Sequence, residues 1–319
     1  MEQKSIKKTT HTPQEITALI RMFFSHMQIR LTEYQSHENL LGTYAVHLLP
    51  VHSISTGFCG TGRTAELARA GAYLQCLCDL CTQPDLPFYS LRNKQICSCS
   101  RMAETVTCAG DTPETALIQG ISELFSRKAA AGRHLLSAAP EISESVLTGC
   151  QEARRMYRLL KQQYGDSTRL FDISGSGIQF SAALEIGYEQ NQETVCTYSA
   201  HPDPDIALER LLVNAMHGTR FSDALYYGES GKNIDLQAFL QSLLRQGYDI
   251  RIADCSCAGL SVYQVMIPEL TAVLPELPHP KRVTHTLAFH AAAQRCREYR
   301  AAHPANPEQL FAGLIPRCG

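Results

Sequence analysis

Three cysteines lie close together in the first third of the chain, where Cys76, Cys78 and Cys81 form the pattern C-x-C-x-x-C. Thiolates are ligands for zinc and for iron–sulfur clusters. On a helix, Cys76 and Cys78 would lie on different faces, whereas Cys78 and Cys81 could converge. Three interpretations stay open: small buried hydrophobic side chains, a thiol site for a metal or for sulfur transfer, and exposed thiols without a role.

Glu123 and Arg127 form a second candidate group, a carboxylate and a guanidinium group four residues apart in the sequence. On its own, this spacing indicates a salt bridge along a helix surface. The short run Gly175-Ser176-Gly177 lacks the length of a G-x-G-x-x-G phosphate loop and precedes a predicted strand, which favours a turn. The spacing of Ser, His and Asp residues supports no hydrolytic triad.

The elements that must position these residues follow from apolar spacing and capping residues. Thr12-Pro13-Gln14-Glu15 carries a capping box and opens the first helix, and Asp111 or Thr112 caps another before Pro113. Further helices are predicted over 64–81, 113–131, 143–164, 204–219, 237–246 and 284–301. Strands are predicted over 43–52, 169–173, 178–186, 249–254 and 261–267, and the glycines between 57 and 62 predict a turn. Without a strict βαβ alternation, this order favours an α/β (α+β) fold with mixed sheets flanked by helices.

The composition narrows the possible function classes. The chain has 319 residues, a formal net charge of −2 and 44% hydrophobic residues, as in a globular protein, and nothing points to nucleic acid as a partner. Its polar start, MEQKSIKKTT, lacks the apolar region of a signal peptide, and no apolar run is long enough for a membrane span. The odd count of 13 cysteines argues against a fully paired disulfide set. We expect a cytoplasmic protein with reduced thiols.

Four segments can be taken together. They are Gly57–Thr64 with the following Ala68–Tyr73, Gly110–Arg127, His201–Pro204 with its helix to Arg220, and Ile250–Leu270, which ends in a predicted turn at Pro268-Glu269-Leu270. In this order, the four segments resemble the YcaO family. The second is similar to a family helix that reads GNTPEEALVQGLSEIFER. The resemblance covers nearly the whole chain. It implies one YcaO-like domain over 1–319, with a polar tail at 1–10 and a proline-containing tail at 304–319.

The resemblance implies a site for ATP and Mg²⁺ in a cleft between two halves. Active family members phosphorylate a peptide-backbone amide oxygen after nucleophilic attack, and the products are azolines, thioamides or amidines. Such chemistry needs hard oxygen ligands for magnesium and cations for phosphate.

The first metal motif of the family, Ser-x-x-x-Glu-x-x-Glu, corresponds here to Gly71, Gln75 and Cys78. Both carboxylates are therefore replaced. Gln75 keeps a carbonyl oxygen, whereas the soft sulfur of Cys78 is a poor magnesium ligand.

The second motif, Gln-x-x-x-Glu-x-x-Glu-Arg, is better preserved. Gln119, Glu123 and Arg127 match it, while Ser126 replaces the second Glu. In the third motif, Asn214 and His217 stand for Glu and Gln, and the terminal Arg remains as Arg220. The resulting relict candidates for ATP or phosphate are Lys8, Gln119, Glu123, Arg127 and Arg220, with Glu123 as the remaining magnesium carboxylate.

Three functions are compatible with this pattern. The first is a degenerate YcaO protein, a non-catalytic or less active partner subunit in azoline- or thioamide-type backbone modification. The second is an active ATP-dependent, amide-activating enzyme that uses Gln119, Glu123, Arg127 and Arg220. The third is a sulfur-handling protein with zinc or an iron–sulfur cluster on Cys76, Cys78 and Cys81. A peptide or protein substrate or a partner enzyme is expected, and a homodimer stays open because family members often dimerise.

Overall fold

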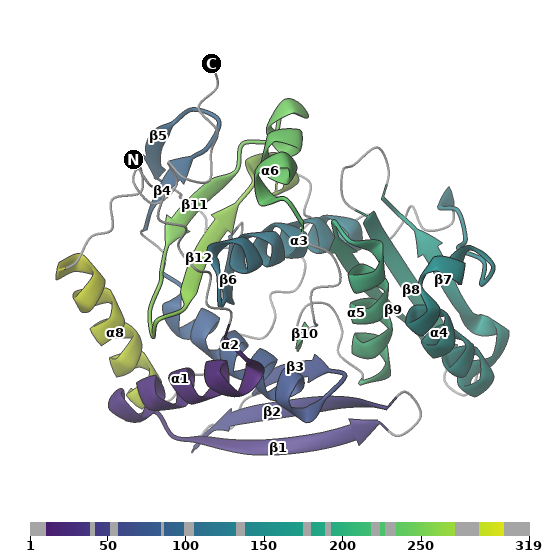
Figure 1. The fold of residues 1–319 in the computed structure, drawn as a ribbon, viewed down its shortest axis with the longest axis horizontal. Coiled ribbons are helices and arrows are strands. Elements are labelled where there is room, and N and C mark those ends of the chain that lie inside the picture. The colour runs from purple at the N-terminus through teal and green to yellow at the C-terminus, as the bar shows by residue number, and fades with distance from the viewer. Residues whose placement is uncertain are drawn as a thin grey trace, which may run out of the picture.

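The computed structural model describes most of the chain, and its elements form three antiparallel or mixed sheets with helices packed between and around them (Figure 1). The residues described are 11–38, 42–51, 57–83, 86–98, 105–131, 138–174, 180–188, 193–217, 224–226, 234–271 and 287–302. The tails predicted at 1–10 and 304–319 lie outside this part. The α/β architecture agrees with the expected fold class.

The first sheet has the strand order β1-β2-β3-β10. Its strands are β1 (Leu31–Glu38), β2 (Thr43–Pro50), β3 (Phe58–Gly62) and β10 (Ala224–Tyr226). Helices α1 (Pro13–His26) and α2 (Ala65–Cys81) contribute side chains to the same core cluster as β2 and β3. The predicted capping box is present at α1, where the Thr12 hydroxyl accepts from the Glu15 amide.

The prediction of a glycine-rich turn at 57–62 is wrong, because Phe58–Gly62 form strand β3. The glycines serve close packing instead. A Cβ atom at Gly60 would lie 2.1 Å from the backbone nitrogen of Ala72, and one at Gly62 would lie 2.8 Å from the Cβ of Leu67. Only a residue without a side chain lets α2 approach the strand this closely.

The second sheet has the order β5-β4-β11-β12-β6. Its strands are β4 (Pro87–Ser90), β5 (Gln95–Ser98), β6 (Val106–Gly110), β11 (Arg251–Asp254) and β12 (Ser261–Met266). Helices α3 (Pro113–Ala131) and α6 (Leu236–Arg245) share a core cluster with it. The turn predicted at Pro268-Glu269-Leu270 is instead a one-turn helix, α7 (Pro268–Thr271), since proline suits the first position of a helix.

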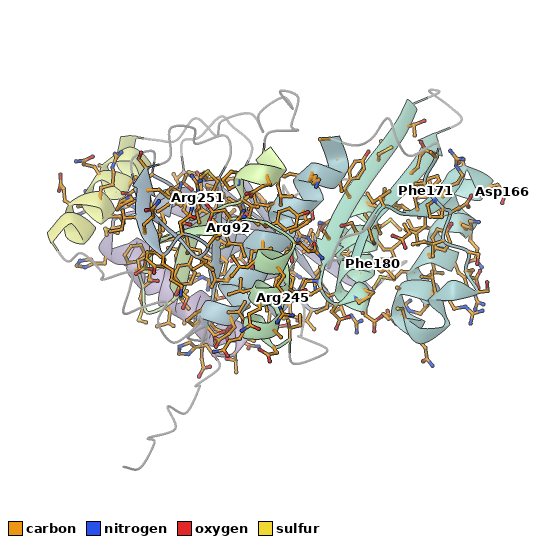
Figure 2. The ribbon with its side chains drawn as sticks, turned by 90° about the horizontal axis from the view of Figure 1, so that it is seen from above. Arg92, Asp166, Phe171, Phe180, Arg245 and Arg251 are labelled. Carbon is orange, nitrogen blue, oxygen red and sulfur yellow. The ribbon has the colours of Figure 1, made fainter. Side chains whose placement is uncertain are left out.

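The third sheet has the order β7-β8-β9, with strands β7 (Thr168–Asp172), β8 (Phe180–Tyr188) and β9 (Glu193–His201). Ala182 and Leu184 pack with α4 (Gln151–Tyr164) and α5 (Pro204–Met216), whereas Ala183 packs on the opposite face with Ala130 of α3. Figure 2 shows Phe171 of this sheet toward one end of the molecule and Arg251 of the second sheet toward the other. Helix α3 therefore contacts the second sheet as well as the third (Figure 1).

The helix predicted over 143–164 begins later than expected. Val146–Gly149 is a separate 3₁₀ turn, and α4 starts only at Gln151. Strands β1 and β9 were not predicted, and β1 is an exposed edge strand whose side chains show no apolar alternation. The C-terminal helix α8 (Leu287–Ala302) packs on the core of α1 and α2 through Ala292 and Cys296. In the described part of the chain, no helix is long and apolar enough to cross a membrane.

Candidate functional site

Helix α3 carries the best preserved of the predicted site residues. Thr112 rather than Asp111 caps it, because the Thr112 hydroxyl accepts from the Thr115 amide at 3.2 Å. Gln119, Glu123 and Arg127 then follow at four-residue intervals on one side of the helix. This side turns inward, and Glu123 is only 7% exposed.

The Glu123 carboxylate is held by two guanidinium groups. Arg127 Nε donates to Oε1 at 3.2 Å, and Arg210 Nη2 donates to Oε2 at 2.7 Å. Arg127 also donates from Nη1 to the carbonyl oxygen of Thr105 at 3.2 Å. The predicted Glu123–Arg127 pair therefore exists, but Glu123 is a buried anion between two cations instead of a surface residue.

Arg210 is the member of this cluster that sequence reasoning missed. It lies on α5, 7% exposed, and its ion pair with Glu123 joins α5 to α3. Its Nε atom is buried without a hydrogen-bond partner among the described residues. One signal was available: Arg210 lies three residues after Ala207 and four before Asn214, which places a charge on the buried face of a predicted helix.

His201 extends the charged cluster at the end of β9. Burial, followed by the nearby positive charge of Arg210, lowers the pKa of its imidazole to about 4. Its Nδ1 accepts from the Asp203 amide at 3.0 Å, so the ring is neutral near pH 7. Asp203 caps α5, because its carboxylate accepts from the Asp205 amide at 3.0 Å.

Ser126, predicted to stand where the family motif has a second Glu, has a structural role. Its hydroxyl donates to the Ser122 carbonyl at 2.9 Å and accepts from the Ala200 amide at 2.8 Å. The side chain thus joins α3 to β9. A glutamate here would have to displace a buried contact between a helix and a strand.

Asn214 and His217, at the third motif, contact the first sheet. Thr61 Oγ1 of β3 lies 2.9 Å from Asn214 Oδ1, and Thr43 Oγ1 of β2 lies 3.1 Å from His217 Nε2. These contacts attach the end of α5 to β2 and β3. Lys8, Arg220 and the Gly175–Gly177 turn lie outside the described residues.

On α2, Gln75 is half-buried and Cys78 is 2% exposed within the core that α2 shares with α1 and β2. Burial, followed by the neighbouring Cys108, raises the pKa of the Cys78 thiol well above its usual value. The protonated thiol is therefore strongly favoured, and it neither carries a negative charge nor offers a hard ligand.

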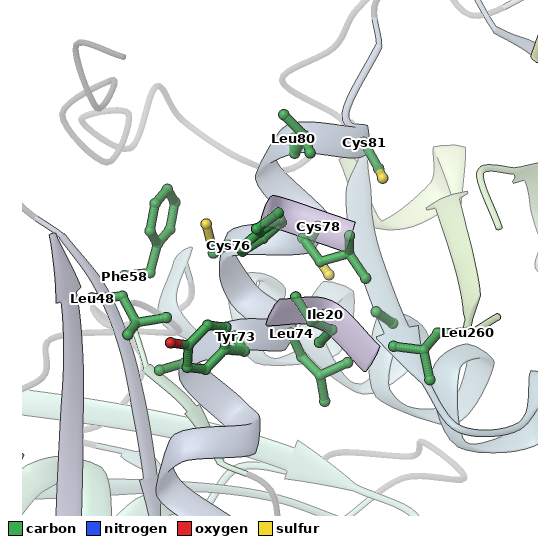
Figure 3. Close-up of a cluster of buried hydrophobic side chains, with 14 of the residues drawn as sticks. Ile20, Leu48, Phe58, Tyr73, Leu74, Cys76, Cys78, Leu80, Cys81 and Leu260 are labelled. Carbon is green, nitrogen blue, oxygen red and sulfur yellow. The ribbon is translucent and has the colours of Figure 1, made fainter. Parts of the chain in front are cut away.

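The cysteine pattern on α2 does not converge on one point. Cys76 and Cys78 point to opposite sides of the helix (Figure 3), as their spacing predicted. Burial also raises the pKa of the Cys76 thiol well above its usual value. Within the described ranges, no cluster of three or more His, Cys, Asp or Glu residues could hold a metal ion.

The side chains at the three predicted metal motifs can be compared with the ligands that Mg²⁺ prefers, which are oxygen atoms in octahedral geometry. In the described part of the chain, Glu123 supplies the carboxylate, and guanidinium groups already bind both of its oxygens. The other positions carry Gln75, Cys78, Ser126, Asn214 and His217. This set does not fit magnesium held by several carboxylates.

The chain is similar to proteins of known fold. The model of the family described as YcaO cyclodehydratase, ATP- and Mg²⁺-binding, matches residues 88–225. The structure of YcaO from Methanopyrus kandleri bound with AMPPCP and Mg²⁺ aligns with a TM-score of 0.60 at 16% identity, over 84% of this chain and 95% of that one. A heterocyclase in complex with substrate and cofactor aligns with a TM-score of 0.57 at 14% identity, over 85% of this chain and 54% of that one.

This chain thus spans about half the length of that heterocyclase. No curated protein matches the sequence. Residues 88–225 therefore match the YcaO family model, and the fold of most of the chain is that of a YcaO structure.

Proposed function

We propose that this protein is a degenerate YcaO member that does not use Mg²⁺-ATP and acts as a binding or partner subunit in the modification of a peptide or protein backbone. One observation carries the proposal: the Glu123 carboxylate is bound by Arg127 and Arg210. A magnesium ion at Glu123 would have to compete with two guanidinium groups, one of them buried. Each charge-assisted contact is worth roughly 1.5–3 kcal/mol, so the competition is costly.

The replaced residues support the same proposal. Cys78 is part of a hydrophobic core, and Ser126 and Asn214 hold helices against strands. Each has a structural role at a position where the family has a metal ligand. The polar positions of a catalytic site have become contacts that stabilise the fold.

The binding role rests on the family and the fold. The heterocyclase with the similar fold was solved with a substrate, and we propose that this chain likewise binds a peptide or protein segment, or an intact YcaO enzyme that does so. One YcaO-like domain over 1–319, cytoplasmic and able to form a homodimer, remains part of the proposal. The type of modification, azoline or thioamide, would be set by the catalytic partner.

Isothermal titration calorimetry of the full chain with ATP, in magnesium and in EDTA, tests the loss of magnesium use. We expect the same weak or absent heat in both conditions, and no change in Glu123→Gln. Glu152→Gln, which removes a carboxylate from a surface pair with Arg155, is the matched control. Micromolar binding that requires magnesium and is lost in Glu123→Gln but kept in Glu152→Gln would overturn the proposal.

An active ATP-dependent enzyme is the second candidate, and the buried Arg210 favours it. Arg127 and Arg210 place two cations beside Glu123, and the Nε of Arg210 has no hydrogen-bond partner among the described residues. Such a group could meet a phosphate once Glu123 rotates toward a metal. Magnesium-dependent release of ADP or phosphate in the presence of a peptide substrate would favour this candidate over the first.

A further inference from the structure

Cys81 and Cys257 bring two thiols together from distant parts of the chain. Their sulfur atoms lie 3.3 Å apart, although 176 positions separate them in the sequence. Cys81 is the last residue of α2, and Cys257 lies in the turn between β11 and β12. Both residues are thiols in this structure.

The two thiols differ in access. Cys81 is fully buried, whereas Cys257 is partly exposed at the surface turn. A reagent in solution can therefore reach the sulfur of Cys257 first. Cys81 lies behind it, in position to react in a second step.

Both cysteines sit on well-anchored backbone. Cys257 and Leu260 exchange backbone hydrogen bonds of 3.3 and 2.9 Å around a two-residue turn at Ala258 and Gly259, whose φ angles are +56° and +75°. Positive φ at both central residues is the tight hairpin geometry that suits paired strands.

The backbone next to Cys81 is also anchored, because Thr82 caps α2. Its amide donates to the Cys78 carbonyl at 3.0 Å, and its hydroxyl lies 2.7 Å from that of Thr107 on β6. The backbone at both cysteines is therefore held in place, so the proximity of the two side chains is built into the fold.

We propose that Cys81 and Cys257 form a reversible disulfide that fastens the C-terminal end of α2 to the β11–β12 turn. A disulfide bond of about 2.0 Å requires the sulfurs to approach by little more than about 1 Å, which side-chain rotation can supply. The inference goes beyond the proposed function and does not depend on it.

The reaction is a thiol–disulfide exchange with a low-molecular-weight disulfide, RSSR, such as oxidised glutathione. The Cys257 thiolate attacks one sulfur of RSSR, forms a mixed disulfide and releases one thiolate RS⁻. The Cys81 thiolate then attacks the Cys257 sulfur, forms the protein disulfide and releases the second RS⁻. The protein loses two electrons and two protons, and RSSR becomes two molecules of RSH.

The bond would act on a helix that carries two of the replaced motif positions, Gln75 and Cys78. It would link α2 covalently to the second sheet, where the described contacts are now non-covalent. Because it would close a loop of well over 100 residues, the oxidised protein should unfold at a temperature higher by roughly 5 °C.

Peptide mapping after oxidation tests the proposal. The full chain is equilibrated with glutathione buffers of increasing oxidised fraction, alkylated, digested without reductant and analysed by mass spectrometry. We expect a Cys81–Cys257 cross-linked peptide that disappears on addition of dithiothreitol. Cys97→Ser, which alters another partly exposed cysteine, is the matched control and should leave the cross-link unchanged.

Single variants identify the order of events. In Cys81→Ala, Cys257 should retain a stable glutathione adduct, because its resolving thiol is gone. In Cys257→Ala, the buried Cys81 should stay unmodified. The proposal is overturned if wild-type protein accumulates the same adduct on Cys257 as Cys81→Ala, or if both cysteines are alkylated in every buffer. Because both of these outcomes are measured on wild-type protein, they still test the proposal when a variant fails to fold.

Discussion

Helices α2 and α3 carry the positions predicted to correspond to the first two metal motifs, and the two helices surround these positions with different partners. On α2, the two predicted positions are Gln75 and Cys78, and Cys78 belongs to a hydrophobic core. On α3, Glu123 keeps its charge but is bound by Arg127 and Arg210. A preserved motif residue therefore does not by itself indicate a preserved function, because its partners decide what the side chain is able to bind.

The largest expected effect concerns the packing of α2. Gly60→Ala would place a Cβ atom 2.1 Å from the backbone nitrogen of Ala72, so strand β3 and α2 would have to separate. We expect a loss of roughly 4 kcal/mol in the free energy of unfolding, measured by urea denaturation.

Gly149→Ala is the control for this variant, because a Cβ there would meet nothing within 4 Å. It should change the stability by less than about 0.5 kcal/mol. Equal stability of both variants would contradict the close approach of α2 to the strand.

The charged cluster on α3 gives the next largest effect. Glu123→Ala leaves the buried Arg210 without its anion, which should cost roughly 3 kcal/mol of stability. A double-mutant cycle should show stronger coupling of Glu123 to Arg210 than to Arg127, whose side chain is 32% exposed. If both couplings were below about 0.5 kcal/mol, Glu123 would not be held as described.

His201 should give the smallest of these effects, and it depends on pH. Its folded-state pKa of about 4 lies below the usual 6.5, so the unfolded chain binds a proton that the folded protein does not between these values. Stability should therefore fall as the pH drops, by about 2 kcal/mol between about pH 7.5 and pH 4.5.

His201→Asn should flatten this dependence, measured as urea midpoints across the same pH range. Its carboxamide oxygen can still accept from the Asp203 amide, which separates titration from hydrogen bonding. A variant with the same pH profile as wild-type protein would show that another group is responsible.

Much of the fold followed from local signals. Capping residues and proline predicted α1 and α3 well, because those signals lie within a few residues of the helix start. Strand β3 was mistaken for a turn, since the glycines that usually mark turns here make room for α2. Strand β1 escaped prediction because an exposed edge strand needs no apolar alternation.

The candidate site was only half predictable. The Glu123–Arg127 pair is encoded by a spacing of four, but Arg210 lies 87 positions from Glu123 and meets it only through the packing of α5 against the third sheet. The contact between Cys81 and Cys257 likewise depends on tertiary structure. Sequence patterns identify which residue types are present, whereas their partners come from the fold.

The central claim, that the magnesium side of the site is lost, is tested most directly with Mn²⁺ as a paramagnetic substitute for Mg²⁺. Electron paramagnetic resonance of Mn²⁺ and a non-hydrolysable ATP analogue, with and without the protein, reports whether a protein-bound metal exists. We expect the spectrum of Mn²⁺ with the nucleotide alone, unchanged by the protein. A protein-dependent signal from bound Mn²⁺ that disappears in Glu123→Gln and persists in Glu152→Gln would contradict the account.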